Sequence, residues 1–467
     1  MADQLAGLSA TDIAEGVRSG RFTARAVTEA HLARIASHDL MLGAFTSVTR
    51  ARALKQADAI DARRAAGEAL GPLAGVPYAV KNLFDVAGVA TLAGSKINAD
   101  DPPAARDATL VERLTSADAV LLGALNMGEY AYDFTGENAH FGPSRNPHDS
   151  SRMSGGSSGG SGTATAAGFA AVTLGSDTNG SIRVPSSLCG LFGLKPTFGR
   201  LSRARSFPFV TSFDHLGPLA RSTADCAAFY DAMSGYDADD PACQDRPAEP
   251  LSPQVSAGIG GLKVAKAVGY FRQGASPEAL AAVDLVAKAL AASEIDIPDA
   301  ARARAAAYVI TNSEGATLHL QRLRERPQDF DPDTRDRFFA GALLPAAYVN
   351  MAQRFRQSFR GTMRSLFSGV DVILAPATPT VAPLIGQKTF ELDGVTLPVR
   401  ANLGIYTQPF SFVGLPVMTV PVWLEGSALP IGVQVVTAAW REDIAVRVAG
   451  HLEAQGLVRS KVAHLGA

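Results

Sequence analysis

The sequence predicts an α/β fold in which helices cover a central mixed β-sheet. Three observations predict this class. Helix-like and strand-like segments alternate along much of the chain, as they do in α/β domains. Most strand-like segments are short apolar runs, which is typical of strands buried on both faces. The chain of 467 residues is 47% hydrophobic and 19% charged, an ordinary globular composition that can form a large core.

The N-terminal part of the chain predicts helices. The segment SATDIAEGVRSG (9–20) has a capping Ser or Thr, an acidic first turn and a closing Gly. Apolar residues recur at roughly helical spacing in 23–39, and the segment 52–70 is similar. We therefore expect an N-terminal helical region over residues 1–70, packed on one larger domain over residues 71–467.

The next elements alternate between strand and helix. The apolar run GVPYAVKNLF (75–84) predicts a strand that contains Lys81, and a lysine is costly to bury unless it has a partner or a role. Residues 109–127 predict a helix, a turn and a strand. Residues 161–177 predict a small-residue helix followed by a strand.

The C-terminal part of the chain predicts three more strands and a closing helix. VDVILAPATPTVAP (370–383) predicts a buried strand that runs into a Pro-rich loop. Residues 414–423 and 430–437 predict a pair of strands. Residues 441–456 predict an amphipathic helix that closes the domain.

The middle of the chain is less informative. Residues 235–260 are polar and rich in Pro and Asp, so we expect a surface insertion there, with 237–253 as the linker candidate. Residues 276–366 predict helices without a recognisable functional motif. One continuous domain overall is the simplest interpretation.

Composition excludes several function classes. The formal net charge of −2 gives no indication of binding to nucleic acid or to a membrane surface. The three cysteines are an odd number at no metal-like spacing, and the histidines form no HExxH motif, so we expect no disulfide framework and no metal. The N-terminus lacks a signal-peptide core and no run of 18 apolar residues occurs, so we expect a cytoplasmic protein.

Two stretches of small polar residues raise the question of function. SGGSSGGSG (154–162) has the composition of a flexible linker, and SDTNGSIRVP (176–185) follows soon after it. A serine hydroxyl is a weak nucleophile unless a base takes its proton, and a neutral lysine in an apolar strand, such as Lys81, can be that base. The segment DTNGS can place a nest of backbone N–H groups around Ser181, as an oxyanion requires.

These stretches resemble the amidase signature family. The resemblance extends over nearly the whole chain and includes the segments GGSSGGSG, SDTNGSIRVPSSLCGLFGLKPTFGRLS, GPLAGVPYAVKNLFDVAG, ENAHFGPSRNP, DHLGPLARS, DVILAPATP and GLPVMTVPV. It implies the amidase signature fold, with the catalytic domain over 71–467. It also implies a Ser–cisSer–Lys triad with Ser181 as nucleophile, Ser157 as the bridging serine and Lys81 as general base.

The resemblance further implies how the nucleophile is surrounded. The peptide bond Gly156–Ser157 is expected to be cis, and the backbone N–H groups of Thr178, Asn179, Gly180 and Ser181 are expected to form the oxyanion hole. The family commonly has two glycines before the nucleophile, where this chain has Asn179–Gly180. Asn tolerates a positive φ better than most residues, and its carboxamide can reach the substrate.

Two flanking features have interpretations of their own. We expect Asp177 and Arg183, which flank the nucleophile, to form a structural ion pair that braces the nucleophile loop rather than to contact the substrate. Ser154 resembles a residue that hydrogen-bonds the lysine in some relatives.

The segments IYTQPFSFVGLP and AAWREDIAVRVA, together with DTNGSIRVP, resemble most the 1-carboxybiuret hydrolase branch of the family. This resemblance implies hydrolysis of a linear amide to urea-1,3-dicarboxylate and ammonia in s-triazine and cyanuric acid degradation, without a cofactor. It also implies a small helical partner similar to the C subunit of tRNA amidotransferase, in a homodimer or heterotetramer. Since a small anionic substrate needs donors and a cation, the candidate substrate-binding residues are Tyr132, Arg205, Tyr406 and Gln408.

Three alternatives stay open at this stage. The glutamine-hydrolysing A subunit of Asp/Glu-tRNA amidotransferase carries the same triad, but the sequence has no counterpart of its C-terminal tyrosine-rich helix motif. A broad-specificity amidase is the second alternative. A non-catalytic scaffold protein is the third, and the presence of all three triad residues argues against it.

Overall fold

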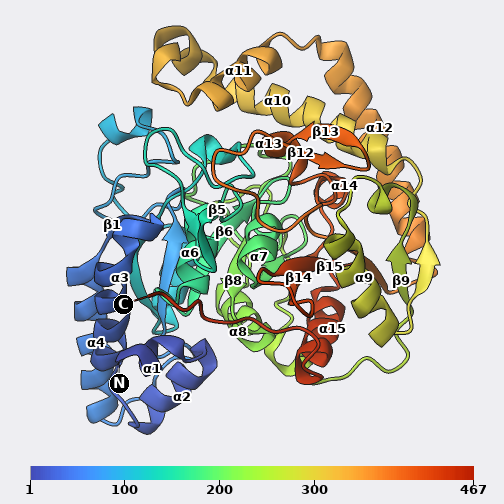
Figure 1. Cartoon of the computed structure of the whole chain (residues 1–467). Coiled ribbons are helices and arrows are strands. Elements are labelled where there is room, and N and C mark those ends of the chain that lie inside the picture. Colours follow the sequence, from blue (N-terminus) through green and yellow to red (C-terminus); the bar gives the residue numbers. More distant parts are fainter. Residues whose placement is uncertain (1, 467) are drawn as a thin grey trace.

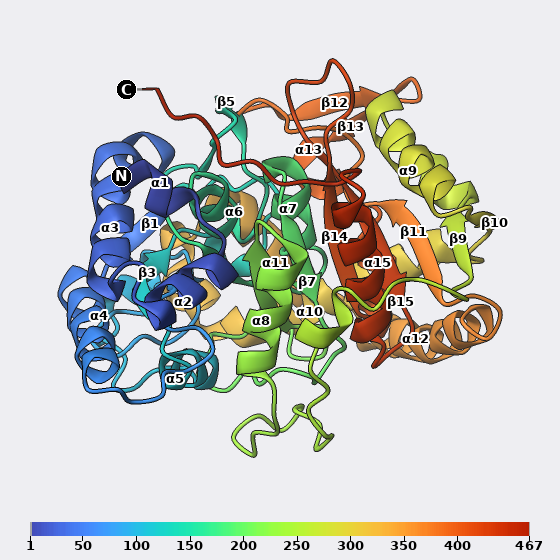
Figure 2. The same ribbon diagram turned by 90° about the horizontal axis from the view of Figure 1, so that it is seen from below.

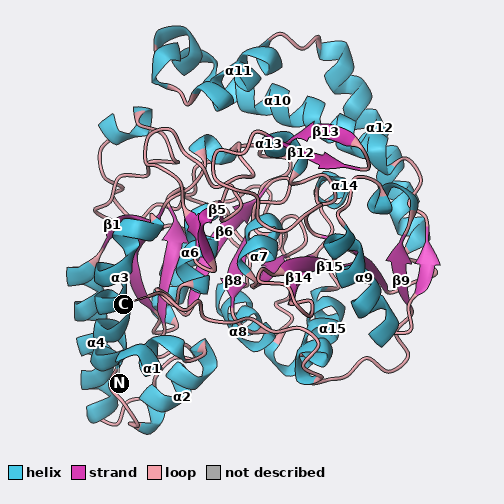
Figure 3. Cartoon of the chain, in the orientation of Figure 1, coloured by secondary structure: helices cyan, strands magenta, loops and turns pink. Residues whose placement is uncertain are grey.

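The computed structural model describes residues 2–466, and within them eleven strands form one mixed β-sheet. From edge to edge the strands are β1 (Phe45–Val48), β3 (Val120–Leu125), β2 (Pro77–Lys81), β6 (Val172–Asp177), β8 (His215–Ala220), β7 (Phe192–Lys195), β14 (Val417–Val422), β15 (Ile431–Thr437), β11 (Val372–Pro376), β9 (Val264–Ala267) and β10 (Ser293–Ile295). The predicted fold class, an α/β fold with a central mixed sheet, is confirmed (Figures 1 and 3).

Strand direction changes across this sheet. Strands β3, β2 and β6 run parallel to one another, as do β11, β9 and β10, while the other neighbouring pairs are antiparallel. Two short hairpins lie outside the sheet: β4 (Arg145–Asn146) with β5 (Asp149–Met153), and β12 (Thr389–Leu392) with β13 (Val395–Pro398). The strands predicted within 75–84, 109–127, 161–177, 370–383, 414–423 and 430–437 are all present.

Helices surround the sheet. They are α1 (Ala2–Gly7), α2 (Ala10–Ser19), α3 (Ala24–Leu42), α4 (Arg50–Ala65), α5 (Thr109–Ser116), α6 (Gly159–Ala166), α7 (Arg183–Cys189), α8 (Thr223–Met233), α9 (Pro277–Ala289), α10 (Ala300–Glu325), α11 (Pro332–Ala342), α12 (Ala346–Leu366), α13 (Val399–Asn402), α14 (Gln408–Val413) and α15 (Glu442–Ala454). Figure 2 shows α8 and α15 over the near face of the sheet, and Figure 1 shows α10 and α11 at the top, with α12 running from there down the right-hand side. None of the described helices is long and apolar enough to cross a membrane.

The helix predicted over 9–20 begins and ends where the sequence predicts, whereas α3 ends after and α4 ends before the predicted segments 23–39 and 52–70 do. The Ser9 hydroxyl caps α2 by accepting from the backbone N–H of Asp12, and Gly20 closes the helix in the left-handed conformation. The strand β1, which the sequence analysis did not predict, follows α3 and pairs antiparallel with β3. The region 1–70 therefore contributes a strand to the main sheet, and the domain boundary at residue 70 stays a prediction.

The stretch 235–260 does not interrupt the sheet, because β7, which precedes it in sequence, pairs with β14, which follows it by more than 150 residues. Residues 244–250 within this stretch are exposed, in agreement with a surface insertion.

Parallel pairing positions the candidate site. Lys81 is the last residue of β2, and Asp177 is the last residue of β6. The two strands are neighbours and run parallel, with Tyr78 opposite Val172, so their carboxyl ends meet at the same edge of the sheet. The loop from β6 to α7, which carries residues 178–182, starts at this edge.

Candidate active site

Lys81 is fully buried and its ammonium group binds two serines. Its Nζ lies 2.6 Å from Ser157 Oγ and 2.9 Å from Ser176 Oγ. Burial lowers the pKa of Lys81 to about 7, against the opposing effect of nearby carboxylates, of which Asp214 is the largest. A substantial fraction of Lys81 is therefore neutral near pH 7, as a proton acceptor must be.

Ser157 lies in the glycine–serine stretch, which is not a linker. Residues 154–162 are all buried, and α6 begins at Gly159 within them. The peptide bond Gly156–Ser157 is cis, as the family resemblance implies. The backbone of the stretch is anchored on both sides of this bond, because Gly156 N–H donates to Phe134 O (2.8 Å) and Ser157 O accepts from Gly128 N–H (3.1 Å).

Asp177 and Arg183 brace the loop that carries the candidate nucleophile. They form a fully buried ion pair in which Arg183 Nη2 lies 2.9 Å from Asp177 Oδ1, so the predicted structural pair is confirmed. Asp177 Oδ2 also accepts from the backbone N–H of Ile182. The Arg183 guanidinium holds the pKa of Asp177 well below its usual range, against the effect of burial.

The backbone N–H groups of residues 178–181 make no hydrogen bonds to other described residues. Gly180 has φ of +144°, a conformation that favours glycine, and a Cβ at this position would lie 2.3 Å from Thr407 Oγ1. The Thr407 hydroxyl donates to Asn179 O (2.6 Å) and so fastens the loop from outside. Four successive unpaired N–H groups on a braced loop fit an oxyanion hole.

Ser181 faces a small cavity of about 20 Å³. Its walls are Ala131, Tyr132, Asp133, Phe134, Thr178, Asn179, Ser181, Phe209, Tyr308, Thr311, Arg337 and Gln408. Within the described residues no hydrogen bond engages the Ser181 hydroxyl, so a proton relay from Ser181 to Ser157 would require the two hydroxyls to come together. This is common before substrate binds, and a cavity that holds about one water must in any case widen for an amide substrate.

Two of the four predicted substrate-binding residues line this cavity. Tyr132 and Gln408 are part of its wall. Tyr406 is buried behind it and donates its hydroxyl to Gln273 O, so it does not reach the cavity.

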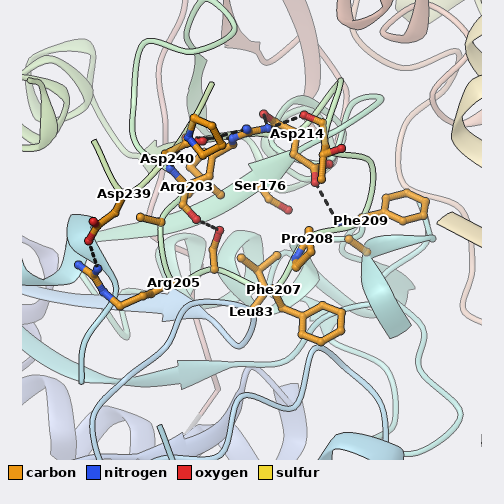
Figure 4. Close-up of a pocket in the computed structure, with 16 residues that line it drawn as sticks. Leu83, Ser176, Arg203, Arg205, Phe207, Pro208, Phe209, Asp214, Asp239 and Asp240 are labelled. Atoms are coloured by element: carbon orange, nitrogen blue, oxygen red, sulfur yellow. Dashed lines mark hydrogen bonds and ion pairs between the residues drawn. The ribbon is translucent and has the colours of Figure 1, made fainter. Parts of the chain in front are cut away.

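Arg205 is also elsewhere, contrary to the sequence-based expectation. Its guanidinium lies 2.9 Å from both Asp239 and Glu112 and lines a neighbouring cavity of about 290 Å³ (Figure 4). Arg205 is therefore already neutralised and is not the cation of the Ser181 cavity. Ser176 and Asp214 lie at the inner end of that neighbouring cavity, next to Lys81.

The cation of the Ser181 cavity comes from the part of the chain whose sequence carries no recognisable motif. Arg337 on α11 lines the cavity, and α10 adds Tyr308 and Thr311. Arg337 packs over the Tyr132 ring and donates to the Tyr132 carbonyl, but within the described residues it has no carboxylate partner. Helical periodicity alone does not show which side chains reach a cavity, so no signal in the sequence could have found these residues.

The second partner of the lysine was also missed. Ser154, the residue suggested by resemblance, donates to Gly155 O, and Ser176 binds Lys81 instead. Ser176 is the last-but-one residue of β6, so its place beside the carboxyl end of β2 could have indicated it.

Comparison with known proteins identifies the family. The model of the Amidase family matches residues 26–445, and the chain therefore belongs to that family, whose members hydrolyse amide C–N bonds. The chain is 55% identical over 456 residues to the 1-carboxybiuret hydrolase subunit AtzE of Pseudomonas sp. (strain ADP), covering 97% of this chain and 100% of that subunit.

Other relatives agree with this placement. A solved, inhibitor-bound structure of an s-triazine catabolic enzyme, which comes from a vestigial protein complex, superimposes with a TM-score of 0.96 at 54% identity, covering 97% of this chain and 100% of that one. The A subunit of glutamyl-tRNA(Gln) amidotransferase from Azotobacter vinelandii is 38% identical, covering 95% of this chain and 96% of that protein. The amidase signature fold predicted from the sequence is thus confirmed.

Proposed function

We propose that this amidase hydrolyses 1-carboxybiuret to urea-1,3-dicarboxylate and ammonia. The observation that carries the proposal is the set of polar groups around Ser181: an unpaired cation, an unpaired acceptor and an unpaired donor in one small cavity. The relationship to the hydrolase of Pseudomonas sp. (strain ADP) supports the same substrate.

In the proposed mechanism the triad relays a proton from Ser181 through Ser157 to Lys81, and later returns a proton to the leaving group. Neutral Lys81 takes the proton of Ser157 while Ser157 takes that of Ser181, and Ser181 Oγ attacks the terminal carboxamide carbon. The oxyanion is held by the N–H groups of residues 178–181. The relay then returns a proton to the leaving nitrogen, ammonia departs, and water hydrolyses the acyl-enzyme by the same path.

Arg337 supplies the positive charge that a carboxylated substrate needs. Because it has no ion pair among the described residues, its charge is available for a carboxylate entering the cavity. A charge-assisted hydrogen bond in such a closed site contributes more than one in water.

Asn179 and Gln408 add one acceptor and one donor. Asn179 Nδ2 donates to Thr311 Oγ1 (2.9 Å), which leaves the buried Asn179 Oδ1 without a partner among the described residues. Gln408 Oε1 accepts from Arg304 Nε (2.9 Å), which leaves the Gln408 amino group for the substrate. A buried acceptor without a partner costs free energy, and an N–H group of a ureido chain removes that cost.

The test compares substrates that differ in one group. The wild-type protein should release ammonia from 1-carboxybiuret with a kcat/KM at least about tenfold above that for biuret, which lacks the carboxylate. Arg337→Met should abolish this preference while leaving turnover of biuret. Equal rates for the two substrates would contradict the proposed anion recognition.

Glutamine hydrolysis within a tRNA-dependent amidotransferase is the second candidate. The 38% identity to the A subunit of the Azotobacter vinelandii enzyme over 95% of the chain favours it. Glutamine carries an α-ammonium group as well as an α-carboxylate, and the Ser181 cavity would have to accommodate both. Release of ammonia from glutamine but not from 1-carboxybiuret would select this candidate.

We also propose that the enzyme acts in the cytoplasm with a small helical partner protein, in a homodimer or heterotetramer. The three cysteines are unpaired thiols, as in proteins of reducing compartments. Leu40 and Met41 in the last turn of α3 are exposed apolar side chains, which mark interaction surfaces when they cluster. Purification of the tagged protein from its native cells should recover a helical protein of under about 100 residues, and recovery of the chain alone would contradict this.

A further inference from the structure

A further cavity, separate from the Ser181 cavity, lies where α12 meets the end of α14. Its volume is about 520 Å³, in the range of small-molecule sites. It is lined by Thr197, Phe198, Arg360, Met363, Arg364, Phe367, Ser368, Val413, Gly414, Leu415, Ala438 and Ala439. None of the residues that line the Ser181 cavity belongs to this set.

Two arginines of this cavity have no counter-charge. Arg360 is half-buried and Arg364 is exposed, one helical turn apart on α12, and neither has a hydrogen bond or an ion pair within the described part of the chain. Burial lowers the pKa of Arg360, which shows that no neighbouring carboxylate compensates its charge. The cavity wall itself contains no acidic side chain.

The same α12 surface stays positive over a further turn. Arg356 is buried, and its guanidinium donates to the backbone carbonyls of Phe412 and Ser212 rather than to a carboxylate. The helix carries four arginines and no acidic residue along its length. Because the Glu314 carboxylate acts on Arg356, which does not line the cavity, the positive charge at the cavity comes mainly from Arg360 and Arg364.

The remaining walls are apolar. Phe198, Met363, Phe367, Val413 and Leu415 present side chains that favour a hydrocarbon or an aromatic ring. Water alone would supply hydrogen-bond acceptors for the arginines but would leave this apolar surface hydrated, which is unfavourable. A ligand with a carboxylate at one end and an apolar body at the other satisfies both.

We propose that this cavity is a second ligand site, which binds a small amphiphilic carboxylate with its acid group on Arg360 and Arg364. The apolar body lies against the Phe198, Met363 and Phe367 side chains. The wall at Val413–Leu415 continues α14, whose other end carries Gln408 in the Ser181 cavity, so an occupant contacts an element of the active site.

Isothermal titration calorimetry with three probes tests this site. Octanoate has both features, octan-1-ol has the apolar body without the charge, and acetate has the charge without the body. The proteins are the wild type, the double variant Arg360→Gln/Arg364→Gln, and Arg354→Gln, an exposed arginine of α12 outside the cavity as matched control. Unchanged ammonia release by the double variant verifies that it is folded.

We expect octanoate to bind the wild type and Arg354→Gln at one site with the same affinity. The double variant should bind octanoate at least tenfold more weakly, and both octan-1-ol and acetate should bind the wild type at least tenfold more weakly than octanoate does. Absence of octanoate binding, or equal binding by the double variant, would overturn the proposal. Binding of octan-1-ol as tight as that of octanoate would show that the carboxylate contributes nothing to binding, and this result would also contradict the proposal.

Discussion

At the scale of single residues, the most informative group is Lys81. A buried ammonium without a counter-ion loses its proton easily, and the lysine here donates to two serine hydroxyls rather than to a carboxylate. The fold brings together Lys81 and Ser157, two of the three residues that the family resemblance implied for the relay, and places Ser181 in a cavity wall, but their catalytic roles stay proposals. Arg337 was beyond prediction by motif, because only packing decides which side chains of α11 reach the cavity, whereas the place of Ser176 near the end of β6 could have indicated it.

The pKa of Lys81 predicts the acidic limb of the pH profile. As pH falls through about 7, Lys81 gains a proton and can no longer accept one from Ser157, so kcat/KM should fall tenfold per pH unit below that point. Ser176→Ala should shift the limb to lower pH, because the ammonium form loses an acceptor. A flat profile between pH 5.5 and 8 would refute Lys81 as the base, and Ser154→Ala serves as a control that leaves the limb in place.

Asn179 is expected to contribute to the preference for 1-carboxybiuret over a simple aliphatic amide. Asn179→Gly removes the buried acceptor and should lower the ratio of kcat/KM for 1-carboxybiuret to that for a simple aliphatic amide by about tenfold, which corresponds to one lost hydrogen bond. The midpoint of urea unfolding should change little. An unchanged ratio would show that Asn179 only shapes the loop.

At the scale of elements, the sequence predicted the strands that are apolar throughout and the helices with clear caps. It missed β1, β7, β8, β9 and β10. In β1, for example, four residues with partial exposure give too short a pattern to separate a strand from a loop. It gave no function to α10–α12, since amphipathic periodicity identifies a buried face but not the cavity that this face meets. The short helix α14 shows the same limit, because its N-cap residue Thr407 donates to Asn179 O, which is more than two hundred residues away in sequence.

Thr407, the N-cap residue of α14, is expected to position the oxyanion loop. Thr407→Val removes the hydrogen bond to Asn179 O and should lower kcat about tenfold with little change in KM, because the oxyanion forms only in the transition state. Thr407→Ser keeps the hydroxyl and should restore most of kcat. A rise in KM at constant kcat in the valine variant would place Thr407 in substrate binding instead.

At the scale of the whole molecule, distant parts of the chain meet at the nucleophile loop. Arg183 at the start of α7 donates to Thr407 O and to Gln434 Oε1 on β15, in addition to its pair with Asp177. The sequence predicted the ion pair, since its members are six residues apart. It could not predict the long-range partners, which depend on the order of strands in the sheet.

This network predicts a large stability effect. Arg183→Met leaves the Asp177 carboxylate buried and unpaired and should lower the free energy of unfolding by about 3–5 kcal/mol. Urea unfolding followed by circular dichroism measures the change. A loss below about 1 kcal/mol would show that water reaches Asp177 and that the pair does not brace the loop.

The central claim is that Ser181 attacks the terminal amide of a carboxylated ureido substrate. The most direct measurement is ammonia release by the purified protein from 1-carboxybiuret, biuret, urea-1-carboxylate, glutamine and acetamide, with Ser181→Ala in parallel. We expect selective release from 1-carboxybiuret by the wild type and a loss on the order of 10⁴-fold or more in the folded Ser181→Ala variant. Release by Ser181→Ala at the wild-type rate would contradict the nucleophile, and glutamine as the preferred substrate would contradict the proposed reaction.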